Sequence, residues 1–194
     1  MLNEKIDSHA ELIRWVDKKI GEPGVPNTPR ALQSCACLQL TMEHQKAIVL
    51  MVSNELYGPA SALMRPCTEA FVRGIWLLDC AADIQVEKFS KGQDPPKFGA
   101  LISDLEKTVI FSAGVLSRAK KQNWKILNGL THGGAEQTSR RLSGTSIGPN
   151  FLDDELCEIL DYSMSIGVNA AINICRLTGA DEIAEEILDK VRKM

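Results

Sequence analysis

The sequence predicts an all-α protein: a single antiparallel helical bundle over residues 1–194, with short accessory helices. Long stretches place apolar residues three and four positions apart, which is the period of an amphipathic helix. No stretch sustains the alternation or the β-branched runs of a strand, so we expect no sheet. Clusters of Pro and Gly divide the chain into segments of helical length. We therefore expect at least about 60% of the residues to be helical, roughly twice the usual content.

The first half of the chain contains three long predicted helices separated by clear breaks. The first covers residues 3–20 and ends at the Gly- and Pro-containing segment 21–26. Thr28 is a suitable N-cap and Pro29 suits the first helical position, so a second helix starts there and runs to about residue 56. Tyr57-Gly58-Pro59 ends it. The third predicted helix spans residues 60–82 and is followed by a short helix over residues 83–90.

The second half begins with a polar loop at residues 91–96. We expect a fifth helix over residues 99–109 and a sixth over residues 113–131, which stops at Gly133-Gly134. Residues 141–150 are rich in Ser, Gly, Thr and Pro and are predicted to form a loop. Asp153 or Asp154 caps a long seventh helix that ends at Gly179, and residues 181–192 form the last helix. Four long helices with short accessory ones are typical of a bundle.

Composition excludes several classes of protein. The chain is 44% hydrophobic and 24% charged, values that exclude a wholly disordered or fibrous chain. The net charge is only −3, but residues 118–141 hold six basic residues against one acid, whereas residues 151–194 hold ten acids against four bases. This asymmetry fits an anion-binding face beside an acidic one. It also fits ordinary solvated helix surfaces, and both interpretations stay open.

The cysteines and the termini indicate a reduced, cytoplasmic setting. The six cysteines show neither a C-x-x-C spacing nor a Cys/His zinc pattern, so we expect no metal site and no cofactor. The N-terminus lacks the basic region and apolar run of a signal peptide. The longest apolar stretch, near residues 48–52, is far shorter than the roughly 20 residues of a membrane span, so we expect no membrane partner.

The third predicted helix is apolar nearly all round, apart from one charged stripe formed by Arg65, Glu69 and Arg73 beside Trp76. Four-residue spacing lets the Glu69 carboxylate bridge both guanidinium groups. One interpretation is a buried ion-pair network that fixes the helix register. The other is a polar pocket in which Glu69 holds two arginines for an anion such as phosphate.

The end of the sixth helix carries a second polar constellation. Trp124, Asn128 and Thr131 share one stripe, and His132 adjoins it before Gly133-Gly134. The glycines would let the backbone approach a ligand closely. His132 is the candidate catalytic residue, a general acid or base near neutral pH, although a helix-end histidine that only hydrogen-bonds a carbonyl group is the open alternative.

We expect the third and sixth helices to be neighbours, because a core helix with three charges needs polar partners. His132 should then face Arg73 or Glu69 in one polar cavity. The candidate anion- or nucleotide-binding residues are Arg65, Glu69, Arg73, Asn128, Gln137, Arg140 and Arg141. The other two histidines, His9 and His44, are predicted to lie on the surface.

Two segments carry a family resemblance. Residues 65–78 read R-P-C-T-E-A-F-V-R-G-I-W-L-L, and residues 127–134 read L-N-G-L-T-H-G-G. Together they resemble an uncharacterised bacterial family of helical proteins with an R-P-x-x-E-x-x-x-R-G-x-W-L helix and a later T-H-G-G segment. That family is similar to the HEPN superfamily (higher eukaryotes and prokaryotes nucleotide-binding). Members of this superfamily are four- or five-helix bundles, often dimeric, and many are metal-independent ribonucleases of toxin–antitoxin and phage-defence systems.

The resemblance implies a HEPN-like bundle, a nucleotide or RNA ligand, a homodimer and a protein partner such as an antitoxin. The ribonuclease members carry an Arg, then four to six intervening residues, then a His, whereas the matching positions before His132, residues 125–127, are Lys, Ile and Leu here. Whether the protein is an enzyme therefore stays open. If RNA is cleaved, His132 acts on the ribose 2′-hydroxyl group while an arginine stabilises charge on phosphorus. The alternative is a non-catalytic interaction protein whose Arg-Glu-Arg stripe is structural.

Overall fold

The computed structural model describes residues 1–22 and 24–194; Pro23, in the predicted first break, lies outside the described residues. Helices make up 74% of the chain, which confirms the all-α prediction. In chain order the elements are α1 (Leu2–Ile20), α2 (Pro29–Ser53), α3 (Tyr57–Asp79), α4 (Asp83–Ser90), α5 (Phe98–Leu105), α6 (Val115–Thr131), α7 (Ala135–Ser139), β1 (Leu142–Ser143), β2 (Ser146–Ile147), α8 (Asp153–Thr178) and α9 (Asp181–Arg192).

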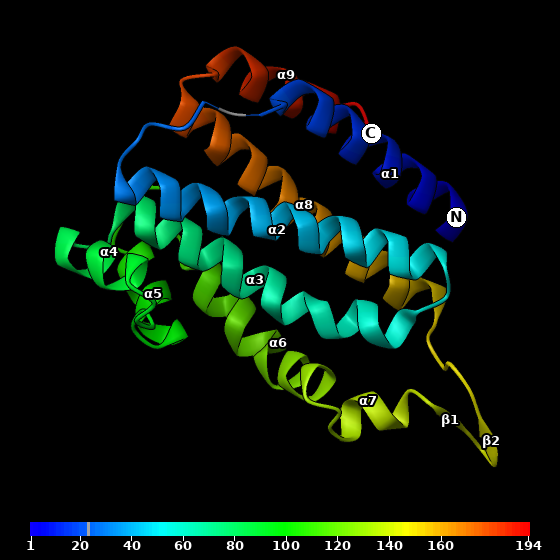
Figure 1. Ribbon diagram of the computed structural model, residues 1–194. Coiled ribbons are helices and arrows are strands. Elements are labelled where there is room, and N and C mark those ends of the chain that lie inside the picture. The colour runs from blue at the N-terminus through cyan, green and yellow to red at the C-terminus, as the bar shows by residue number, and fades with distance from the viewer. Residues whose placement is uncertain (23) are drawn as a thin grey trace.

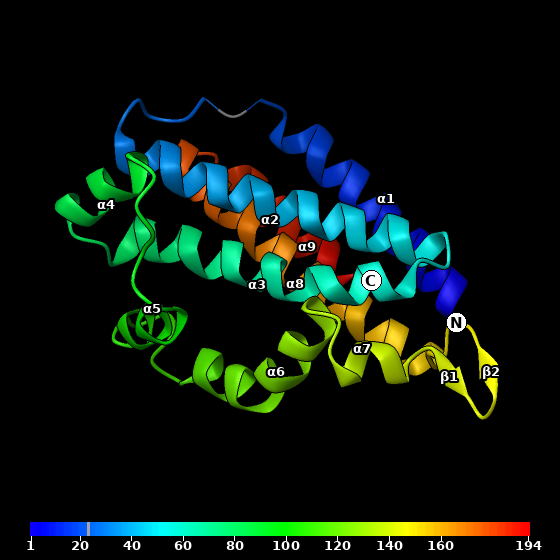
Figure 2. The ribbon, with the colours of Figure 1, turned by 60° about the horizontal axis from the view of Figure 1, so that its bottom comes forward.

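The antiparallel pair of α2 and α3 forms the centre of the fold (Figure 1). Ser34 of α2 donates a hydrogen bond to the Gly74 carbonyl of α3 (2.8 Å), and Cys67 of α3 lies 3.6 Å from the Thr41 carbonyl of α2. Helix α8 packs against both central helices, and α1 and α9 cover α8. Helices α5 and α6 pack on the side of α3 that faces away from α2, as Figure 2 shows. Helix α6 therefore lies beside part of the polar stripe of α3.

Several predicted helix ends are confirmed. The Thr28 hydroxyl oxygen accepts a hydrogen bond from the Ala31 amide (3.2 Å), and Pro29 occupies the first turn of α2. Gly179 ends α8 in the left-handed conformation (φ 69°). Helix α2 ends earlier than predicted, at Ser53, because Glu55 adopts a positive φ of 60° in the turn to α3.

The expectation of no sheet is wrong at one small point. Within the predicted loop, β1 and β2 form a two-stranded antiparallel hairpin, with Leu142 opposite Ile147 and Ser143 opposite Ser146. Gly144, with a φ of 60°, supplies the positive dihedral angle that a tight hairpin turn requires. The short helix α7 before the hairpin was also not predicted. Both elements are too short to show a hydrophobic period.

Two glycines let helices approach α2 closely. A Cβ atom on Gly74 of α3 would lie 3.0 Å from the Leu38 side chain. A Cβ atom on Gly167 of α8 would lie 1.9 Å from Oε1 of Gln45 and 2.2 Å from its Cδ. Gln45 is only 4% exposed and its Nε2 contacts the Met164 sulfur, so the side chain has little room to move. Glycine at these positions therefore fixes how deeply α3 and α8 pack.

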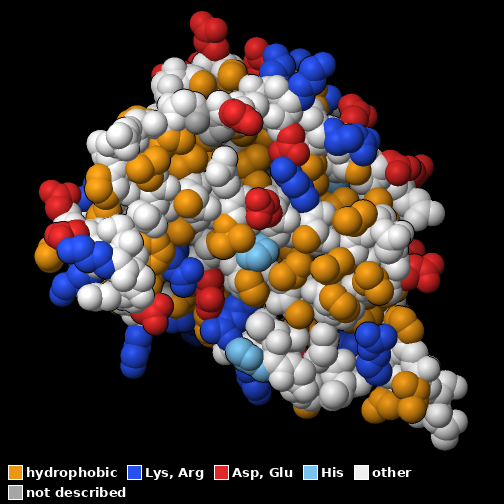
Figure 3. Space-filling view, viewed as in Figure 1, with side chains coloured by type: hydrophobic (Ala, Val, Ile, Leu, Met, Phe, Trp, Pro, Cys, Tyr) orange, Lys and Arg blue, Asp and Glu red, His pale blue; other side chains and the backbone are white. Residues whose placement is uncertain are grey.

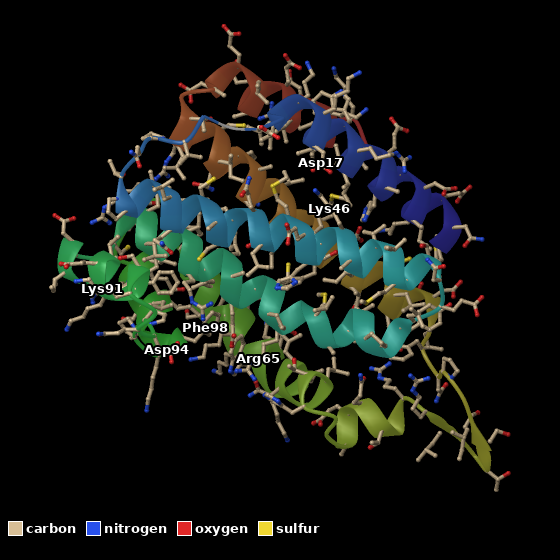
Figure 4. All side chains as sticks on the ribbon, in the orientation of Figure 1. Asp17, Lys46, Arg65, Lys91, Asp94 and Phe98 are labelled. Atoms are coloured by element: carbon tan, nitrogen blue, oxygen red, sulfur yellow. The ribbon has the colours of Figure 1, made fainter. Side chains whose placement is uncertain are left out.

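Side chains between α1 and the rest of the bundle are more polar than expected. The prediction that His9 lies on the surface is wrong: His9 is 6% exposed, and its Nε2 lies 3.5 Å from Oδ1 of Asp161 on α8. His44 is half-buried rather than exposed. Lys46 and Asp17 also link α2 to α1, 2.8 Å apart (Figure 4). His9 is buried because α1 packs against α8 at this position, and the spacing of apolar residues in α1 alone does not show that packing.

We expect the stability of the protein to fall on mild acidification because of His9. Burial lowers the pKa of His9, against a smaller opposing effect of Asp161. The unfolded chain therefore takes up a proton first, and folded stability is lost as the pH falls through the ordinary histidine pKa of about 6.5. The melting temperature should fall between about pH 7.5 and pH 5.5, and His9→Gln should reduce that fall. An equal fall in both proteins would contradict this role of His9. Burial also lowers the pKa of His44, so the melting temperature of His9→Gln should still depend on pH to some extent.

The thiol groups lie inside the bundle. All six cysteines are free, and five of them are buried, with Cys80 the partly exposed exception. Burial raises the pKa of Cys67 to about 12. No helix in the described part of the chain combines the length and the apolar character needed to cross a bilayer.

Candidate functional site

Helix α6 lies directly against α3, which confirms that the third and sixth helices of the prediction are neighbours. The Thr131 hydroxyl group, in the last turn of α6, lies 3.2 Å from the Ala62 carbonyl oxygen of α3 and 2.8 Å from the Leu127 carbonyl oxygen of its own helix. This shared hydrogen bond ties the end of α6 to the first half of α3. The polar groups of both helices are thereby brought to one interface.

Arg65 is the centre of this interface. Its Nε donates to Oε1 of Glu69 (2.9 Å), and its Nη1 lies 2.7 Å from Nε2 of His132. Its guanidinium carbon lies 5.1 Å from the centre of the Trp124 ring, within the range of a cation–π contact. The side chains of Arg65 and Glu69 are 24% and 25% exposed, and His132 is exposed. We call these four residues, Arg65, Glu69, Trp124 and His132, the Arg65 cluster.

The contact between Arg65 and His132 has one possible direction. A guanidinium group has donors only, so Nε2 of His132 accepts the hydrogen bond. An imidazole ring that accepts at Nε2 carries its hydrogen on Nδ1. The lone pair that would accept a proton in catalysis therefore points at Arg65.

The T-H-G-G segment positions His132. Gly133 has a φ of 64°, and the Gly134 amide donates to the Gly129 carbonyl oxygen (2.8 Å), which is the long-range bond of a Schellman motif. A Cβ atom on Gly134 would lie 3.2 Å from Cα of Gly129. The two glycines thus end α6 sharply and turn the chain into α7. The turn formed by these two glycines places His132 next to Arg65.

Arg73 does not join the Arg65 cluster, and the prediction that Glu69 bridges two arginines is wrong. Among the described residues, Glu69 forms an ion pair with Arg65 only, while Nε of Arg73 is buried without a hydrogen-bond partner. Arg73 follows Arg65 by eight residues, and at about 100° per residue its position is rotated roughly 80° around the helix axis from that of Arg65. There its charge acts on Cys37 of α2, whose pKa it lowers against the larger raising effect of burial.

Asn128 lies on α6 one turn before Thr131, and its Oδ1 is buried without a partner in the described part of the chain. Among the described residues, no hydrogen bond joins its side chain to Arg65. An unpaired buried acceptor costs free energy unless a ligand or water satisfies it.

Three further candidates lie elsewhere. Nε2 of Gln137 donates to the Gly58 carbonyl oxygen at the start of α3 (2.9 Å), and the Arg141 guanidinium lies beside the same glycine. Arg140 pairs with Glu155 at the start of α8 and lies 5.2 Å from the ring centre of Phe151. These side chains hold α7 and the hairpin against α3 and α8. The structure therefore divides the predicted residues between the Arg65 cluster and two structural contacts of α7 and the hairpin, while Arg73 and Asn128 belong to neither.

Sequence reasoning missed the contribution of α5. Phe98 stacks on Trp124 with ring centres 4.2 Å apart and an angle of 10° between the planes. Figure 4 places Phe98 close to Arg65, on the side of α3 where α5 and α6 lie. A lone Phe at the start of a short helix gives no signal of such a contact in the sequence. Among the described residues, no group of three or more His, Cys, Asp or Glu side chains is placed to hold a metal ion.

The Glu69→Ala variant should be moderately destabilised, because it leaves Arg65 without its carboxylate in a partly desolvated place. We expect a loss of about 1–2 kcal/mol, between the values for exposed and for buried ion pairs. Glu87→Ala is the matched control, since Glu87 forms the same four-residue pair with Lys91 but both side chains are more than half exposed. Urea unfolding of both variants measures the difference, and equal losses would show that the Arg65 cluster behaves as ordinary surface.

The model of DUF6988, a family of unknown function, matches residues 38–193, a range that includes the whole Arg65 cluster. Comparison with curated proteins and with solved structures gives no match.

Proposed function

We propose that this chain, which belongs to the DUF6988 family of unknown function, binds the phosphate group of a nucleotide or of RNA at the Arg65 cluster. The observation that carries the proposal is the 2.7 Å contact between Nη1 of Arg65 and Nε2 of His132. It brings a guanidinium group of α3 and an exposed imidazole group of α6 to one point on the surface. An exposed pair of this kind fits a phosphate-binding site better than a purely structural contact, in which every polar group would be buried and hydrogen-bonded.

The geometry leaves room for an anion. Glu69 accepts from Nε of Arg65 and His132 from Nη1, so Nη2 is the guanidinium nitrogen without a partner among the described residues. A phosphate group that binds Nη2 and replaces His132 at Nη1 gains a bidentate, charge-assisted contact.

The same displacement supports ribonuclease activity. When phosphate takes Nη1 of Arg65, Nε2 of His132 is released and its lone pair can accept the proton of a ribose 2′-hydroxyl group. Arg65 then lies where negative charge develops on phosphorus. The resemblance to HEPN ribonucleases supports this reading, and with it a HEPN-like bundle in a bacterial toxin–antitoxin or defence system. The Arg-to-His spacing of those ribonucleases has Lys125 in place of its arginine in this chain. The arginine beside His132 comes from α3 instead.

Arg65→Gln tests the binding site. We expect it to weaken binding of a fluorescent adenosine monophosphate analogue about tenfold or more, since one charge-assisted contact is worth roughly 1.5–3 kcal/mol. Arg192→Gln is the matched control, because Arg192 is an exposed arginine of α9 with its own acidic partner, Asp189. Equal affinities of the two variants would remove the site.

The second candidate function is a non-catalytic interaction protein, and one surface favours it. Helix α2 carries large exposed hydrophobic residues along one side: Leu32 is 45%, Leu40 is 41% and Leu50 is 66% exposed. Figure 3 shows hydrophobic side chains gathered over α2 and α3 on this face. Such a face fits a second copy of the chain, in a homodimer, or a protein partner such as an antitoxin. Sedimentation of the protein and of Leu40→Asp would detect a dimer that depends on this face.

A further inference from the structure

A wide cleft opens between α5 and α6. Its volume is about 680 Å³, within the range of small-molecule sites. Three lysines line it, Lys107, Lys120 and Lys121, against a single acid, Glu106. The cleft is therefore a concave surface with an excess of positive charge.

Two of the three lysines have no acidic partner among the described residues. Lys107 pairs with Asp104 (2.8 Å), which lowers the pKa of that carboxyl group. Glu106 is also engaged, because its Oε1 accepts a hydrogen bond from the Ser117 amide (2.7 Å). Lys120 and Lys121 are left as ammonium groups that line the cleft from α6. A bound anion offsets their positive charge.

Lys120 reaches across the cleft because Gly99 leaves it room. A Cβ atom on Gly99 of α5 would lie only 2.8 Å from Nζ of Lys120. The ammonium group thus lies against α5 instead of extending into solvent. A lysine held in this way loses less conformational freedom when it binds a ligand than a free surface lysine does.

The inner wall of the cleft is apolar. Ile102, 4% exposed, lines it from α5. Trp124 lines it from α6 with the edge of its ring, since Phe98 stacks on one face of the ring and the Arg65 guanidinium group lies over the other. A ligand of this cleft therefore gains from an aromatic group against Ile102 and the edge of Trp124, and from negative charge near Lys120 and Lys121.

We infer that the α5–α6 cleft is a second anion site, which binds a phosphate monoester carrying an aromatic group. The dianionic phosphate lies between Lys120 and Lys121, and the aromatic group packs against Ile102 and the edge of the Trp124 ring. This site adjoins the Arg65 cluster, with which it shares Trp124, and does not depend on the function proposed for that cluster.

Phenyl phosphate is the probe, and titration calorimetry measures its binding. We expect it to bind at least about tenfold more tightly than inorganic phosphate or phenol, because only phenyl phosphate makes both kinds of contact. Lys120→Gln should weaken its binding about tenfold. Lys125→Gln is the matched control, since Lys125 is exposed on the same helix and is not a lining residue of the cleft; its affinity should stay within about twofold of the unaltered protein.

Three results would overturn the inference. Phenyl phosphate that fails to bind removes the site, and equal losses in Lys120→Gln and Lys125→Gln show only diffuse charge attraction. Loss of phenyl phosphate binding in Arg65→Gln, with Lys120→Gln unaffected, would place the phosphate at the Arg65 cluster instead. Binding of phenyl phosphate that survives Arg65→Gln, while the adenosine monophosphate analogue no longer binds, keeps the two sites distinct.

Discussion

The Gly167→Val variant should be the most strongly destabilised, by about 3 kcal/mol, the upper part of the range for overpacked cores. A Cβ atom at this position would overlap Gln45, at 1.9 Å from Oε1 and 2.2 Å from Cδ. Gln45 is buried between α2 and α8 and cannot swing out to solvent. The whole of α8 must therefore shift away from α2, and contacts at the centre of the bundle are lost.

Ser165→Val is the control for this prediction, because Ser165 is an exposed residue of the same helix. It introduces the same β-branched side chain and should cost under about 1 kcal/mol, the scale of helix propensity alone. Urea unfolding of both variants measures the free energies. A Gly167→Val protein as stable as Ser165→Val would mean that α2 and α8 do not cross as closely as described.

His132→Ala should abolish any metal-independent RNA cleavage by this protein. General acid–base catalysis by a histidine contributes roughly 10²- to 10⁴-fold to a rate, so the loss is the largest functional effect expected. Nucleotide binding should remain mostly intact, because a neutral imidazole group adds little to phosphate affinity beside an arginine. Incubation of purified protein with single-stranded RNA in the presence of a metal chelator measures the activity.

Arg65→Gln gives the complementary result: it should lose both binding and cleavage. Thr138→Ala is the control, since Thr138 is exposed on α7 and its hydroxyl group bonds only to nearby carbonyl oxygens. Cleavage that survives His132→Ala would show that the histidine is not the catalytic group. Absence of cleavage by the unaltered protein, with no nucleotide affinity, would favour the interaction protein with its apolar α2 face.

The helices were predictable because their signals are local. Thr28 and Pro29 mark the start of α2, and Gly179 marks the end of α8, through preferences that act within one turn. The hairpin at Leu142–Ile147 was missed because two-residue strands have no hydrophobic period to detect. The close packing at Gly167 was missed for a different reason: the clearance depends on Gln45, which is more than a hundred residues away in the chain.

The candidate site was predictable only in part. Helical spacing places Arg65 and Glu69 together, and the polar side of α6 indicates its contact with α3. The spacing does not show which way a long side chain turns, so Arg73 was wrongly assigned to Glu69. His132 was expected near Arg73 or Glu69, yet its hydrogen-bond partner is Arg65. Phe98 reaches Trp124 only through tertiary packing of α5.

The buried thiols make the native protein a slow target for alkylating reagents. Such reagents attack the thiolate form, and burial raises the pKa of the Cys67 thiol to about 12, so almost none of it ionises near neutral pH. Cys80 is the single partly exposed thiol among the six. The other five become reactive only when helices separate. The rate at which a maleimide modifies these thiols therefore reports how often the bundle opens. Mass spectrometry of the labelled peptides would show which helix separates from the bundle first.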